Sequence, residues 1–433
     1  MSRETKSKEA QASRRVQSLD VLRGVAIIGT LLTNIWIFAI GSGGDPVYLL
    51  GKSEEFLAPL SNAISNGKFL GLLSILFGVG IAIQFESAVR NGLRWPWRYE
   101  WRSLLLLADG FLHFALVVQF DILMGYALVG MVIAPLLLLR TRWLVVATVL
   151  AGALHLVLEF NRMLAGRSAG GRGGDGDWAE GFGGGSLGSG FGGGSLGSGF
   201  GGAWDGEVPM TYFAEVADRM GNFWALREEA FIIAPPLSAF LFLCGVLLWR
   251  AGLFRGDARA HAMSRWLAVG GLTIGGTLTA WEYLPLAGKD IIGALSRYTV
   301  APIVAFGYLG LILILLRRRG GSGFLSRRLA DVGRTALSCY MLQNVVAIVA
   351  FSQWGLGLGP FGPLGTVLSW AAISALLMLG AWWWLRHFRQ GPFELVWRWA
   401  VNAPFQRADR RRQEKRDEDE KQATADRTSV GAP

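Results

Sequence analysis

The stretch SLDVLRGVAIIGTLLTNIWIFA, residues 18–39, decides the fold of this chain. It is an apolar run of about the twenty residues that a helix needs to cross a bilayer. Its polar side chains Asp20, Arg23 and Asn34 fall within roughly an 80° arc of a helix. Polar groups gathered on one face point toward protein or water rather than lipid. The stretch therefore predicts a membrane-spanning helix inside a bundle, with a candidate functional face.

The composition extends this prediction to most of the chain. Of its 433 residues, 52% are hydrophobic and only 17% are charged, whereas soluble proteins carry about a quarter charged residues. The apolar residues form runs of membrane-spanning length. The sequence thus predicts an all-α, polytopic transmembrane bundle of about ten spans, at residues 20–40, 67–88, 102–120, 122–140, 143–162, 230–249, 266–285, 296–316, 334–352 and 364–385.

The basic residues predict the orientation of these spans. With both termini in the cytoplasm, 32 of the 42 Lys and Arg residues fall in cytoplasmic segments, as the positive-inside rule requires. This pattern explains the net charge of +10 without nucleic acid as a partner. The partner that the chain requires is the lipid bilayer.

The same patterns divide the chain into six parts. The repeat FGGGSLGSG at 182–190 and 191–199 marks a flexible low-complexity segment. Apolar residues at helical spacing after it predict an amphipathic helix on the outer membrane face. The predicted parts are a cytoplasmic tail (1–17), spans 1–5 (18–163), an external Gly/Ser-rich linker (164–206), an external amphipathic helix (207–229), spans 6–10 with a juxtamembrane segment (230–399) and a charged, disordered cytoplasmic tail (400–433).

The third span carries three ionisable residues, which are costly at membrane depth and are therefore functional candidates. Asp109 and His113 are four residues apart on one helix face, close enough for the carboxylate to orient the imidazole. On a straight helix Asp121 would lie about 12 Å along the axis from His113. Asp121 can therefore pair with this histidine only if the helix breaks.

The ninth span adds further polar groups. Tyr340, Gln343 and Asn344 are too many polar groups for a purely structural span, so some of them are predicted to line the same cavity as the polar face of the first span. Arg334 is predicted to anchor the inner surface. No cluster of residues has a metal-ligand spacing, so a metal site is not expected. Cys244 and Cys339 lie inside apolar runs and imply no disulfide framework.

Four sequence blocks make the chain similar to a known family. They are RVQSLDVLRGVAIIGTLLTN (15–34), KFLGLLSILFGVGIAIQ (68–84), GFLHFALVVQFDILMGYALVG (110–130), and GRTALSCYMLQN (333–344) together with RHFRQGPFELVWR (386–398). With them the chain resembles the YeiB-like family of bacterial integral membrane proteins (domain of unknown function 418). This resemblance implies a multi-pass protein of the bacterial cytoplasmic membrane.

The LDxLRG opening is also similar to that of membrane acyltransferases of the acyltransferase-3 and heparan-glucosaminide acetyltransferase types. This similarity implies acyl transfer from a cytoplasmic thioester, with acyl-coenzyme A as co-substrate and no permanently bound cofactor, to an acceptor at the outer face. Acyltransferase-3 proteins place a histidine near the end of the first span, where this chain has Asn34.

The two arguments together give a hypothesis for the site. His113 is the candidate base and Asp121 its catalytic companion, and Asp109 and Arg334 are secondary candidates. Candidate donor- or substrate-binding residues are Asp20, Arg23, Asn34, Tyr340 and Gln343. The alternative is a transporter or flippase that uses the same polar face as a path for a small molecule or lipid. The acceptor, the acyl group and the oligomeric state are left open by the sequence.

Overall fold

The computed structural model of the protein describes residues 3–41, 47–170, 211–228, 231–232, 234–320 and 323–406. Within these ranges the chain is helical, and its only β-type pairing is an isolated bridge between Val47 and Phe361. The all-α prediction is therefore confirmed. The FGGGSLGSG repeats and the charged tail after residue 406 lie outside the described residues.

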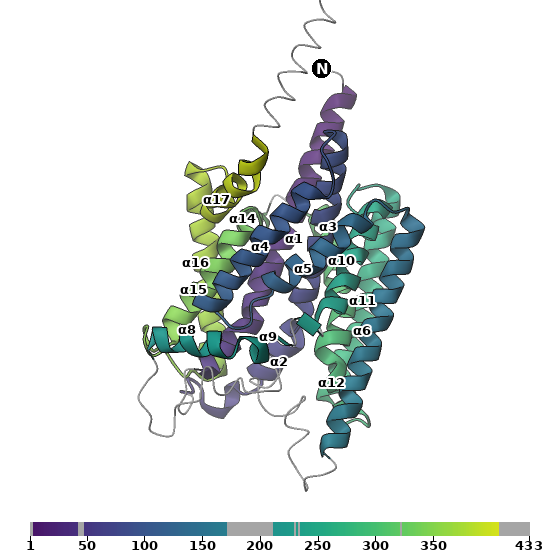
Figure 1. Ribbon diagram of the computed structural model, residues 1–433. Coiled ribbons are helices and arrows are strands. Elements are labelled where there is room, and N and C mark those ends of the chain that lie inside the picture. Colours follow the sequence, from purple (N-terminus) through teal and green to yellow (C-terminus); the bar gives the residue numbers. More distant parts are fainter. Residues whose placement is uncertain are drawn as a thin grey trace, which may run out of the picture.

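The helices follow one another without a sheet (Figure 1). They are α1 (Arg3–Gly41), η1 (Gly51–Glu54), α2 (Leu57–Ser65), α3 (Lys68–Arg90), α4 (Trp97–Leu116), α5 (Leu123–Leu136), α6 (Thr141–Gly170), α8 (Tyr212–Gly221), α9 (Phe223–Glu228), α10 (Ala234–Ala251), α11 (Ala258–Tyr283), α12 (Lys289–Leu295), the π-helical turn η5 (Ser296–Val300), α13 (Ala301–Arg318), α14 (Phe324–Arg334), α15 (Ala336–Phe351), α16 (Pro363–His387), α17 (Pro392–Asn402) and η6 (Ala403–Phe405).

Each of the ten predicted runs contains a helix, but not every helix has the length and apolarity of a membrane span. Six segments of the described chain qualify: Val16–Ala39, Gly51–Arg90, Thr141–Leu164, Ala234–Ala251, Lys289–Arg318 and Pro363–His387. A seventh is obtained if α14 and α15, which meet at 90°, count as one bent span. The structure thus shows a bundle with about six candidate membrane-spanning helices, and the number ten stays a prediction.

Among the remaining predicted spans, two helices are too short and one carries too many charged residues to qualify as a membrane span. Helix α5 has only 14 residues, and α15 has 16. Helix α4 is long enough but carries Arg98, Glu100, Arg102 and Asp109. Two predicted boundaries also shift: α1 begins at Arg3, inside the predicted tail, and α6 continues to Gly170, past the predicted start of the linker at 164.

Helix α1 lies at the centre of the bundle. In its most apolar window 78% of the residues are buried, compared with 22% in α6. One apolar core contains Leu22 and Ala26 together with residues of α3, α5, α10 and α13. A second contains Leu31 and Ile35 together with residues of α15 and α16. Because α1 contributes to both cores, it joins the two halves of the protein.

Two glycines allow α1 to pack closely on α14. A Cβ atom on Gly24 would overlap the backbone carbonyl of Leu329, and one on Gly333 would overlap the carbonyl of Asp20. Both glycines belong to the sequence blocks that carry the family resemblance. Their role is therefore to let two backbones touch, as small residues do between membrane helices.

The short helices mark the two ends of the bundle. Helices α2, α8, α9 and α12 lie at one end, called the α8 end below, and α17 lies at the other, the α17 end, near the start of α1 (Figure 1). Helices α8 and α9 cross the bundle rather than running along it. They occupy the range 207–229 for which the sequence predicts an amphipathic helix.

Candidate functional site

A break between α4 and α5 brings His113 and Asp121 together. Helix α4 ends at Leu116, and the chain turns back before α5 begins at Leu123. The Asp121 Oδ2 atom accepts hydrogen bonds from the backbone amides of Leu123 (2.8 Å) and Met124 (3.3 Å). This is the geometry of an N-terminal helix cap. Asp121 Oδ2 thus satisfies two amides at the start of α5, and Oδ1 is available to His113.

His113 is oriented by Asp121 and not by Asp109. The His113 Nδ1 and Asp121 Oδ1 atoms lie 2.9 Å apart, and both side chains are fully buried. Asp109 forms no hydrogen bond with any described residue, and its buried Oδ2 atom is without a partner there. The four-residue spacing allowed Asp109 to orient the imidazole, but the break after α4 meets the condition under which Asp121 can pair with His113, and Asp121 is the partner in the structure.

Helix α15 completes the hydrogen bonds of this pair. The Tyr340 hydroxyl donates to Asp121 Oδ1 at 3.2 Å, and the Asn344 amide nitrogen lies 3.3 Å from His113 Nε2. With Asn344 donating to Nε2, the imidazole is neutral and its Nδ1–H donates to Asp121. Asp121 then accepts four hydrogen bonds, so that α4, α5 and α15 are tied together at one buried carboxylate.

Arg227 of α9 holds the turn that carries Asp121. Its guanidinium donates to the backbone carbonyls of Gln119 (3.1 Å) and Asp121 (2.6 Å), and it lies 5.1 Å from the centre of the Phe114 ring. Only 1% of this side chain is exposed, and burial lowers the pKa of the guanidinium. Arg227 lies in the range 207–229, for which the sequence predicts an external amphipathic helix, and its helical spacing does not indicate this buried role.

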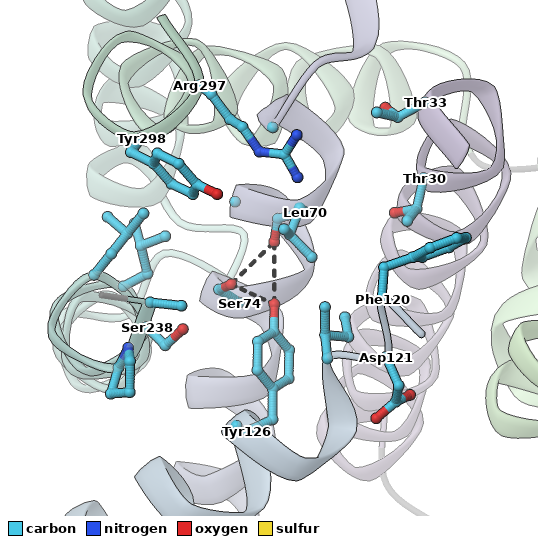
Figure 2. A pocket seen from close by; sticks show the side chains of 18 of the residues that line it. Thr30, Thr33, Leu70, Ser74, Phe120, Asp121, Tyr126, Ser238, Arg297 and Tyr298 are labelled. Carbon is cyan, nitrogen blue, oxygen red and sulfur yellow. Dashed lines mark hydrogen bonds between the residues drawn. The ribbon is translucent and has the colours of Figure 1, made fainter. Parts of the chain in front are cut away.

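A cavity of about 170 Å³ lies beside this network, toward the α8 end (Figure 2). It is enclosed by α1, α3, the 119–122 turn, α5, α9, α10, η5 and α15. Figure 2 shows Arg297 and Tyr298 of η5 reaching into this space, with Thr30 and Thr33 of α1 across from them. Ser74 and Tyr126 meet at 2.5 Å on another wall.

The structure brings together some of the predicted site residues. Asn34, Asp121 and Tyr340 all line the cavity. His113 does not line it and instead lies behind Asp121. Gln343 is fully buried, and neither atom of its amide has a hydrogen-bond partner among the described residues.

The other predicted residues lie near the α17 end. Asp20 and Arg23 form an ion pair at 3.5 Å. Arg23 precedes Asn34 by eleven residues, which is about 16 Å along a helix. Arg334 lies 4.0 Å from Asp331 and donates to the Arg389 carbonyl. None of the three lines the 170 Å³ cavity, so the two groups of candidate residues occupy opposite halves of the bundle.

Comparisons with known proteins show what this chain is similar to. Residues 248–404 match the family described as "Protein of unknown function (DUF418)". The chain is 29% identical over 423 residues to "Uncharacterized protein YxaH" of Bacillus subtilis (strain 168), with 91% of this chain and 96% of that protein covered. It is 26% identical over 412 residues to "Uncharacterized protein YeiB" of Escherichia coli (strain K12), covering 88% and 94%. The chain is therefore similar to the YeiB-like proteins over most of its length.

One residue in a YeiB-like sequence block explains why that block folds back on the bundle. Glu394 of α17 accepts hydrogen bonds from the backbone amides of Leu337 (2.7 Å) and Ser338 (3.1 Å) and from the Ser338 hydroxyl (2.5 Å). It therefore caps the start of α15, the helix that carries Tyr340 and Asn344. Nothing in the sequence of the block 386–398 indicates this role of Glu394, because its partners lie more than fifty residues earlier in the chain.

Proposed function

We propose that this YeiB-like protein is an acyltransferase-like enzyme of the bacterial cytoplasmic membrane. It would move an acyl group from a cytoplasmic thioester, acyl-coenzyme A, to an acceptor at the outer face. The observation that supports this proposal is the buried His113–Asp121 pair, of which Asp121 lines the cavity. A carboxylate that fixes the tautomer of an imidazole is the arrangement that general-base catalysis uses.

The proposal places both termini in the cytoplasm and ten spans in the bilayer. The α17 end then faces the cytoplasm and the α8 end faces outward, as the distribution of Lys and Arg favours. Arg23, with Asp20 and Arg334 nearby, would meet the phosphates of the donor at the inner face. The acceptor would enter the cavity at the outer half.

In the chemical step the acceptor hydroxyl or amine attacks the acyl carbonyl carbon, and the carbon–sulfur bond breaks to release the thiol. His113 Nε2 would take the acceptor proton while Asp121 stabilises the imidazolium, and the imidazolium would then give this proton to the leaving thiolate. Because His113 lies behind Asp121 and Asn344 occupies its Nε2, the Asn344 side chain must rotate away and the cavity must extend toward α15 for the acceptor to reach the base. The Asn34 amide would donate a hydrogen bond to the oxyanion.

An acyl-transfer assay with a His113→Ala variant tests this proposal. Membrane vesicles that contain the protein would receive labelled acetyl-coenzyme A, and label in envelope components would be counted. Loss of a general base should lower the rate about 10²–10⁴-fold. A matched control is His261→Ala, because His261 is an exposed histidine on α11. Activity within a few-fold of the parent for His113→Ala would exclude His113 as the base.

Transport is the second candidate, and the discontinuous helix at the cavity favours it. The π-helical turn η5 lies between α12 and α13 and breaks the regular α-helical geometry there. Both Arg297 and Tyr298 of this turn line the cavity. Transporters commonly build substrate sites from broken helices in mid-bundle. Movement of a substrate across sealed vesicles without covalent change would favour transport over acyl transfer.

A further inference from the structure

The charged groups that line the 170 Å³ cavity are already engaged within the protein. Asp121 accepts four hydrogen bonds from neighbouring residues. The Arg227 guanidinium donates to two backbone carbonyls of the 119–122 turn. The Arg297 guanidinium lies 5.4 Å from the centre of the Tyr298 ring and is engaged there. The hydrogen-bonding capacity that is left for a ligand therefore lies in neutral groups.

Two amides belong to these neutral groups. Asn34 is 94% buried, lines the cavity and forms no hydrogen bond with a described residue. Gln119, in the turn before Asp121, also lines the cavity, and neither atom of its amide has a partner in the described part of the chain. A buried amide without a hydrogen bond raises the free energy of the fold. A ligand that bonds to these amides is therefore favoured.

Two hydroxyl groups lie on opposite sides of the same space. Thr33 of α1 and Ser238 of α10 both line the cavity, and Figure 2 shows them across from one another. Neither hydroxyl bonds to a described residue, whereas those of Ser74 and Tyr126 bond to each other at 2.5 Å. A serine or threonine hydroxyl both donates and accepts hydrogen bonds. A ligand group that also does both, as an alcohol does, can bond to either side.

The rest of the lining is apolar and sets the size and character of the remainder of the ligand. Leu70, Leu237 and Leu241 belong to it. A cavity of roughly 150 Å³ holds a benzene-sized molecule, so this one has room for a small polar group and a short apolar portion. A whole lipid would have to leave its chains outside.

We infer that this cavity binds the hydroxyl-bearing part of a neutral, amphipathic molecule. The Asn34 amide oxygen accepts a hydrogen bond from one ligand hydroxyl, and Thr33 and Ser238 bond to the ligand at its two sides. The Asn34 NH₂ group then stays available for the oxyanion of the proposed reaction. Such a ligand would be the acyl acceptor, a role that rests on the proposed function, whereas the binding itself does not. Two sources share this chemistry: a neutral lipid alcohol of the bilayer and a water-soluble sugar or polyol.

Binding of defined probes to the purified full-length protein in nonionic detergent tests the inference. Calorimetry would compare 1,2-dihexanoylglycerol, which has one free hydroxyl, with its 3-acetyl ester, in which that hydroxyl is blocked, and with the charged dihexanoylphosphatidic acid. Methyl β-D-glucoside is the soluble hydroxylated probe. We expect one hydroxylated neutral probe to bind at least about tenfold more tightly than both the blocked ester and the phosphatidic acid, which leave the neutral groups of the lining poorly paired. Preference for dihexanoylglycerol indicates a lipid ligand, and preference for the glucoside indicates a soluble one.

Variants locate the site of binding. Asn34→Leu and Ser238→Ala should each weaken binding of the preferred probe about three- to tenfold through the loss of one hydrogen bond. Ser238→Thr, which keeps the hydroxyl, should weaken it less, and Asn402→Leu changes an exposed asparagine on α17 as the control. The inference would be overturned if the blocked ester or the phosphatidic acid bound as tightly as the better hydroxylated probe, if neither hydroxylated probe bound, or if folded Asn34→Leu and Ser238→Ala proteins kept the parent affinity. Because no acyl donor is present, a failure of the acyl-transfer proposal leaves this result intact.

Discussion

At the scale of single residues, two carboxylates in similar sequence surroundings have opposite structural roles. Asp121 caps α5 and binds His113 and Tyr340, whereas Asp109 forms no hydrogen bond with a described residue. The difference arises because α4 ends between them. A buried carboxylate is stabilised by the hydrogen bonds that it accepts, and only Asp121 accepts them.

This difference predicts unequal effects of two matched substitutions. Asp121→Asn keeps the shape of the side chain but removes its charge and one acceptor oxygen. We expect it to lower the free energy of unfolding by about 1–3 kcal/mol. Asp109→Asn should change stability by less than Asp121→Asn, because no hydrogen bond is lost. Thermal unfolding of both variants in detergent would measure this, and an equal loss for the two would contradict the assigned roles.

At the scale of elements, the sequence predicted where helices form but not where they bend. Apolar runs located every long helix, since burial in lipid and in the core requires the same residue types. The predicted spans 102–120 and 122–140 meet in the stretch VVQFDI (117–122), but this stretch contains no glycine or proline that would show how sharply the chain turns. The break depends on the cap by Asp121 and on Arg227, whose helix is about a hundred residues away. The sequence therefore named His113 and Asp121 together as catalytic candidates, but their direct hydrogen bond depends on a break whose geometry only the fold supplies.

Glu394 shows how one helix fixes another. Its carboxylate caps α15 from α17, and α15 presents Tyr340 and Asn344 to the His113–Asp121 pair. Glu394→Ala removes three hydrogen bonds to a charged acceptor and should lower the unfolding temperature clearly. It should also speed amide hydrogen exchange at the start of α15. The control Glu55→Ala changes an exposed glutamate, and indistinguishable exchange in the two variants would mean that Glu394 does not hold α15.

At the scale of the whole molecule, α1 connects two apolar cores and two groups of polar residues. The Asp20–Arg23 pair lies toward the α17 end, and Asn34 lies in the cavity toward the α8 end. Any function that uses both groups must act across most of the bilayer. The orientation of the bundle therefore decides which group meets the cytoplasm.

The proposed topology makes a direct prediction about the two ends of α11. This helix has 26 residues, about 39 Å, which suffices to cross the hydrocarbon core although it is not among the six most apolar segments. Its two ends can be probed with single cysteines at two exposed positions: Arg259, in the first turn of α11, and Lys289, beyond its last residue. With both termini in the cytoplasm, Lys289→Cys should react with a membrane-impermeant maleimide on intact cells, and Arg259→Cys only after permeabilisation. The parent protein, with Cys339 buried and Cys244 half-buried, gives the background. Labelling of both positions from the same side would show that α11 does not span the membrane, and the reverse pattern would place the cavity on the cytoplasmic side.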